Sequence, residues 1–203
     1  MSFAAPAPAP RARPTTVTLA AFALFGAAAI EVISVVIALL YAGKIAENTK
    51  RLYEEAGLST SSNAGLGIGS SVGALFGFIF IVILVVLGYL VSRGNQVGRV
   101  LTWVLGGLLL CCSVVGLGGT LFAKTFWEAG RKSNSRLPDW DRYQDVVYSG
   151  IPGWYQPVTT VLSVLLVIAI LLSIILLALP SSHPYFRKEP QQWEPPLPGQ
   201  PGF

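Results

Sequence analysis

Four long apolar stretches limit what this chain can fold into. They cover residues 17–42, 70–92, 100–123 and 159–179, and each has at least 21 residues. About 20 apolar residues in a helix span a hydrocarbon core of roughly 30 Å. Because unpaired backbone groups are too costly in lipid, each stretch is expected to be an α-helix. The sequence therefore predicts an all-α protein built on a four-helix transmembrane bundle.

The composition agrees with this prediction. The chain is 53% hydrophobic and only 12% charged, whereas a soluble domain has about 25% charged residues. The first apolar stretch, from Val17 to Ala42, is longer than the apolar region of about 7–15 residues that a secretory signal carries. We therefore expect this stretch to be retained as a span.

The segments outside the bundle differ in character. Residues 1–16 and 180–203 are rich in proline, a composition typical of flexible segments that favour polyproline II. Residues 17–179 are expected to form the transmembrane domain, with outer loops at 43–69 and 124–158. The two tails would be tethers or ligands for cytoplasmic partners.

Four spans place both ends of the chain on one side of the membrane. The short connection "SRGNQVGR" carries Arg93 and Arg99 with no acidic residue, and such basic connections favour the cytoplasmic side. The other connections balance their basic residues with nearby acids. We therefore expect a multi-pass protein of the plasma (inner) membrane with cytoplasmic termini.

The first span is expected to continue beyond the membrane as one helix over residues 16–56. Glu47–Arg51, Lys50–Glu54 and Arg51–Glu55 have the i,i+4 spacing of helical ion pairs. Gly57 follows as a natural end of the helix. The small-residue stretch after it, "LSTSSNAGLGIGSS", predicts a hinge.

Glu31 is the only charged residue in the four apolar stretches, which contain no Lys, Arg or His. A charge near the middle of a membrane costs at least about 2.5–3.5 kcal/mol. On a helical wheel, mostly small residues share its face, namely Ala20, Ala23, Ala27, Ala28, Ser34 and Ala38. We expect Glu31 to face other helices and, lacking a countercharge, to be protonated and donate a hydrogen bond. It would be a structural hydrogen bond, a contact for a partner's membrane helix, or a proton or cation site.

Small and polar residues of the other spans predict how the helices associate. We expect a polar layer near the middle of the membrane, formed by Glu31, Ser34, Cys111, Cys112 and Ser113. Close helix packing is expected where glycines let backbones approach. The candidates are Gly69, Gly73, Gly77, Gly107 and Gly116. The fourth span is rich in Leu and Ile, so we expect spans one to three to form the tight bundle and span four to pack at its periphery.

Aromatic residues distinguish the second outer loop. Trp127, Trp154 and Tyr155 lie near span ends, where aromatic rings form an interfacial belt. Trp140 and Tyr143 lie farther from both spans, and the "DWDRY" stretch predicts a short helix folded onto the outer face. Trp140, Tyr143, Trp154 and Tyr155 are the candidate partner-binding surface.

No motif for catalysis or cofactor binding is present. Cys111 and Cys112 are adjacent within a span and the only histidine is His183, so neither a disulfide framework nor a zinc site is expected. Asp141 and Asp145 would share a helical face, but Arg142 beside them indicates surface ion pairing. We expect no enzyme, no catalytic residue, no metal, no cofactor and no nucleic-acid partner.

The start "PAPAPRARP", the four spans and the exit "LLALPSSHPYFR" resemble small four-span bacterial integral membrane proteins with proline-rich termini, most of them uncharacterised. With no reaction chemistry in the sequence, the leading hypothesis is an accessory or scaffold subunit. It would associate with other membrane proteins through its spans or its second outer loop. The alternative is a small proton- or cation-coupled transporter or channel that uses Glu31.

Overall fold

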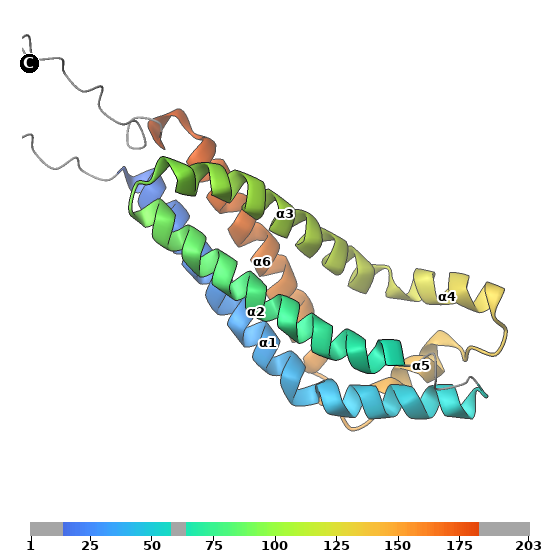
Figure 1. Cartoon of the computed structure of the whole chain (residues 1–203). Coiled ribbons are helices and arrows are strands. Elements are labelled where there is room, and N and C mark those ends of the chain that lie inside the picture. The colour runs from blue at the N-terminus through green and yellow to red at the C-terminus, as the bar shows by residue number, and fades with distance from the viewer. Residues whose placement is uncertain (1–13, 58–63, 183–203) are drawn as a thin grey trace, which may run out of the picture.

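The computed structural model of the chain describes residues 14–57 and 64–182, so most of both proline-rich tails and the start of the expected hinge lie outside the described residues. All regular structure in the described ranges is helical. In chain order the elements are α1 (Thr15–Glu55), α2 (Ala64–Ser92), α3 (Gln96–Leu121), α4 (Ala123–Ser133), α5 (Trp140–Val147), α6 (Tyr155–Ala178) and the 3₁₀ turn η2 (Pro180–Ser182) (Figure 1).

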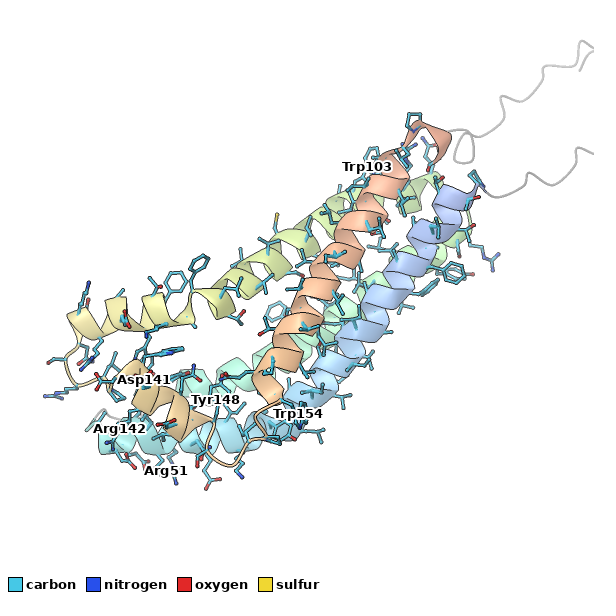
Figure 2. The ribbon with its side chains drawn as sticks, turned by 180° about the vertical axis from the view of Figure 1, so that it is seen from behind. Arg51, Trp103, Asp141, Arg142, Tyr148 and Trp154 are labelled. Atoms are coloured by element: carbon cyan, nitrogen blue, oxygen red, sulfur yellow. The ribbon has the colours of Figure 1, made fainter. Side chains whose placement is uncertain are left out.

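Among the described residues, four helices are long and apolar enough to cross a membrane. They are α1, the Leu75–Ser92 part of α2, α3 and α6. The all-α prediction and the four candidate spans are thereby confirmed. Trp103 and Trp154 lie at opposite ends of this elongated bundle (Figure 2), which is where interfacial aromatic rings belong in a membrane protein.

The helix ends follow mostly from local sequence. Helix α1 is continuous over 41 residues, as expected, and stops before Gly57, whose positive φ of 66° is a conformation that favours glycine. Helix α2 begins at Ala64 rather than at residue 70, so the expected hinge is partly helical. No proline interrupts this stretch, and proline is the residue that most strongly breaks a helix.

A tight turn joins α2 to α3. Gly94 has a φ of +67°, and the Asn95 side chain caps α3 by accepting a hydrogen bond from the Val97 backbone N–H at 3.0 Å. Gly98 then passes so close to α2 that a Cβ there would lie 2.7 Å from the Leu90 Cβ. The two helices are therefore in direct contact at this end of the bundle.

The four long helices form a ring in which α1 packs against α2 and α6, and α3 packs against α6 and, less extensively, α2 (Figure 1). The expectation that the fourth span is peripheral is wrong. Ile170 and Leu177 of α6 are completely buried and join Leu24 of α1 and Leu84 of α2 in the core. The long side chains of α6 fill the space between α1 and α3.

Helix α1 also buries a wider face than the small-residue stripe suggested. Ala20, Ala27 and Ala28 are buried as expected, but the bulky Leu24 and Val35 are buried as well. Two helices contact α1 from different sides, and this explains the wider buried face.

The glycines divide into packed and open positions. A Cβ on Gly77 would lie 2.5 Å from Val35 Cγ2, which confirms close packing of α2 on α1 there. A Cβ on Gly73, Gly107 or Gly116 would meet nothing within 4 Å. The prediction of close helix packing at these three positions is therefore wrong. The surroundings of Gly69 lie outside the described residues. Two packed glycines were not predicted from the sequence: Gly88, which contacts the Phe25 ring, and Gly98. Gly106, one of the third-span glycines expected to pack, contacts Ile174 of α6.

The contact between Gly98 and Leu90 leads to a stability prediction. Gly98→Ala places a methyl group against Leu90 and should lower the free energy of unfolding by about 1–3 kcal/mol, the usual cost of overpacking. Gly107→Ala is the matched control, because it changes the same residue type in the same helix where space is open. Thermal unfolding in mild detergent measures both, and equal melting temperatures would contradict the close contact.

Candidate functional site

Glu31 lies at a close contact between α1 and α2. A Cβ on Gly77 would lie 3.6 Å from Glu31 Oε1, an ordinary contact distance, and 2.5 Å from Val35 Cγ2. The absence of a side chain at Gly77 therefore lets the Val35 side of α1 approach α2, and this places the carboxyl group against α2. Glu31 faces the other helices, as the helical wheel predicted.

A cavity of about 200 Å³ adjoins this carboxyl group, and all four long helices line it. Its lining residues are Glu31 of α1, Phe80 of α2, Cys112, Ser113, Gly116 and Leu117 of α3, and Ser163 and Leu166 of α6. Cys112 and Gly116 are exposed, so the cavity is not sealed. We refer to it as the Glu31 cavity.

The polar groups of the Glu31 cavity differ in how they are satisfied. Ser163 donates to the Thr159 carbonyl one turn earlier at 2.9 Å. Ser113 Oγ is buried and has no hydrogen-bond partner among the described residues. Across residues 14–57 and 64–182 no hydrogen bond or ion pair reaches the Glu31 carboxyl group. The bundle therefore gathers polar side chains without pairing them to one another, and buried polar groups are normally paired.

The expected polar layer is partly present. Glu31, Cys112 and Ser113 line the same cavity. Ser34 does not join them, because its hydroxyl donates to the Ile30 carbonyl of its own helix at 2.9 Å. Cys111 is exposed and lies outside the cavity lining, since successive residues of a helix point about 100° apart.

Two cavity residues were missed or misassigned from the sequence. Ser163 was not selected because the fourth span was expected at the periphery, yet α6 is a wall of the cavity. Gly116 was expected to pack against a helix, but its lack of a side chain instead leaves the cavity open. The available signal for Ser163 was its position as an isolated serine in the apolar run "VLSVLLV".

The second outer loop folds back onto the part of α1 that continues beyond the span. Asn48 is buried, and its Nδ2 donates to the carbonyls of Val147 at 3.0 Å and Ser149 at 3.1 Å. Lys44 Nζ donates to the Gly150 carbonyl at 3.0 Å. These bonds fix the end of α5 to α1.

Charged contacts add to this anchorage. Arg142 donates to Glu55 at 3.1 Å, although the sequence predicted Arg51 as the partner of Glu55. Figure 2 shows Asp141 and Arg142 of α5 beside Arg51 of α1. The predicted Lys50–Glu54 pair is present at 3.7 Å. Exposed pairs of this kind contribute at most about 1 kcal/mol, so the buried Asn48 bonds dominate.

The loop aromatics form a small core of their own. The Tyr143 ring lies 4.2 Å from the Trp127 ring and 5.3 Å from the Trp140 ring, centre to centre. Trp127 also donates to the Pro138 carbonyl at 2.9 Å. Burial, with smaller contributions from Tyr148 and Tyr53, raises the pKa of Tyr143 to about 12. Trp127 and Tyr143 thus hold α4 and α5 together.

Trp154 and Tyr155 have different surroundings. Both rings contact Tyr41 edge-on, at 6.0 Å and 5.2 Å, and Trp154 remains 47% exposed. An aromatic cluster therefore surrounds the point where α6 meets α1. Its place at a span end agrees with the predicted interfacial belt.

The Asn48 bonds yield a prediction about the outer loop. Asn48→Ala removes the donor for two carbonyls and should destabilise the loop locally by about 1–3 kcal/mol, the cost of unsatisfied buried groups. Hydrogen exchange of the backbone amides in α5 should become faster by one to two orders of magnitude, by about tenfold per 1.4 kcal/mol. Lys50→Ala is the control, because it removes only the exposed pair with Glu54. Unchanged exchange in Asn48→Ala would contradict the anchoring role.

Comparison of the chain with protein families, with curated proteins and with solved structures finds no match. Within the described residues, no group of three or more His, Cys, Asp and Glu side chains could hold a metal ion. The chemistry that the described residues offer is hydrogen bonding and charge at the Glu31 cavity, and surface contacts on the folded outer loop.

Proposed function

We propose that this chain is a non-enzymatic, multi-pass accessory subunit that binds another membrane protein in the plasma (inner) membrane. One observation carries the proposal: Glu31 and Ser113 line an unsealed cavity among the spans and have no hydrogen-bond partner in the described residues. A partner helix that supplies hydrogen-bonding groups to Glu31 and Ser113 would offset the cost of holding a carboxyl group within the membrane.

The alternative of a purely internal structural role for Glu31 receives less support. That role requires a hydrogen bond from Glu31 to a Ser, a Cys or a backbone carbonyl of the bundle. Ser34 and Ser163 instead donate to carbonyls of their own helices. These two hydroxyls are therefore engaged elsewhere, and the Ser113 hydroxyl, which lines the same cavity, makes no hydrogen bond with Glu31.

The outer loop offers a second contact surface for the partner. Helix α5 packs onto α1, and α4 contacts α5, so the exposed groups of α5 are held on the bundle. Trp140 and Trp154 are partly exposed there. Aromatic side chains on a rigid scaffold are favourable anchors for protein contacts.

The proposed orientation places the termini in the cytoplasm. Thr16 at the start of α1 and Ser182 of η2 share a hydrogen bond of 3.0 Å, so both chain ends of the bundle lie at one end. The α2–α3 turn with Arg93 and Arg99 lies at the same end (Figure 1). If this basic end is cytoplasmic, as the positive-inside rule favours, both proline-rich tails are available to cytoplasmic partners.

Site-specific photocrosslinking in native membranes tests the association. A photoreactive residue at Cys112, which lines the Glu31 cavity, should give one discrete protein adduct. The same residue at Val104, which is 63% exposed on the same helix but lies outside the cavity, should not give that adduct. The adduct should also disappear in a Glu31→Leu background. Equal adducts from both positions, or none from Cys112, would contradict the proposal.

A small proton- or cation-coupled transporter remains the second candidate, since the cavity beside Glu31 could hold a transported ion. It predicts a flux in liposomes that Glu31→Gln abolishes. Leu39→Ala, a change at an exposed position of α1, should leave the flux intact. The absence of flux, or flux that persists in Glu31→Gln, would exclude this candidate.

A further inference from the structure

The Glu31 cavity contains hydroxyl groups but no positive charge. Ser113 and Ser163 supply hydroxyls to its lining, whereas the four apolar stretches contain no Lys, Arg or His. The nearest basic residue along α1 is Lys44, about 20 Å away at roughly 1.5 Å per residue. The Lys44 ammonium group already donates to the Gly150 carbonyl. No cation of the described bundle can therefore reach Glu31.

We propose that the partner carries a Lys or Arg side chain on a membrane helix and places it at the depth of Glu31. This inference rests on the proposed function and adds the chemistry of the partner. A partner with a hydroxyl group would add only the kind of group that Ser113 and Ser163 already supply to the cavity. Hydrogen bonds to a charged group are roughly twice as strong as neutral ones, and the surrounding lipid screens them little.

The same charge inventory argues against a second copy of this chain as the partner. A second copy would bring apolar spans whose single charge is another Glu31. Two carboxyl groups at one site disfavour each other when charged. A second copy therefore supplies no countercharge for Glu31, whereas a different protein with a basic side chain does.

The rim of the cavity suits a long basic side chain. Gly116 and Cys112 lie on α3 one turn apart and are both exposed, and a Cβ on Gly116 would meet nothing within 4 Å. Small residues let a second helix approach closely. The flexible stem of Lys or Arg can then extend along apolar surface to bring its charged end to Glu31.

Binding of synthetic transmembrane peptides to the full-length protein tests this chemistry. The probes are Leu/Ala peptides of about 20 residues with a single central Lys, Asn or Leu, in phosphatidylcholine vesicles. Energy transfer from a donor on the protein to an acceptor on the peptide measures binding. The Lys peptide should bind at least about tenfold more tightly than the Leu and Asn peptides. This preference should disappear in Glu31→Gln, which removes the charge but keeps the shape.

Three further variants keep the test independent of any folding defect in Glu31→Gln. Gly116→Leu fills the rim at a position with open space and should also remove the preference for Lys. In addition, a peptide can carry a Cys next to its central Lys. On mild oxidation this Cys should form a disulfide with Cys112 of the protein variant Cys111→Ser. It should not do so with Cys111 in Cys112→Ser, because Cys111 lies outside the cavity lining.

Each result decides the inference. Equal binding of the Lys and Leu peptides, tighter binding of the Asn peptide, or a Lys preference that survives both Glu31→Gln and Gly116→Leu would overturn it. Glu31-dependent self-association of the protein stronger than its binding to the Lys peptide would also overturn it. Failure of the proposed function is distinguished by the native-membrane crosslinking, which detects a partner whatever side chain that partner carries.

Discussion

The close approach of α1 and α2 is the interaction on which the rest of the structure depends. A Cβ on Gly77 would lie 2.5 Å from Val35 Cγ2, so this approach requires the absence of a side chain at that position. With α2 in this position, α6 closes the other side of α1, and α3 completes the ring. In lipid, where packing rather than the hydrophobic effect drives helix association, such close seams supply much of the attraction between the spans. The same contact between α1 and α2 places the Glu31 side chain in the cavity that all four long helices line.

Much of this architecture could be predicted from the sequence. The length and apolarity of four stretches identify the candidate spans, and Gly57 predicts the end of α1. The polar residues Glu31, Cys112 and Ser113 were correctly grouped because they lie at similar positions along their spans and line one cavity. These features depend on local composition and helical periodicity, which the sequence carries directly.

The errors arise where several helices share a contact. Periodicity shows which face of a helix is small or polar, but not which neighbour covers it. Gly107 and Gly116 therefore resemble packing sites, although no side chain of another helix in the described residues lies within 4 Å of a Cβ built there. Gly88 was overlooked because its partner, Phe25, lies far away in the sequence. The central position of α6 was missed for the same reason, since a Leu- and Ile-rich helix can face either lipid or other helices.

The uninterrupted course of α1 has a mechanical consequence. One continuous helix, which bends between its two parts (Figure 1), carries both Glu31 of the bundle and Asn48 beneath the folded outer loop, about 26 Å apart along its axis. A shift of the loop would therefore be passed along a single hydrogen-bonded helix to the carboxyl group.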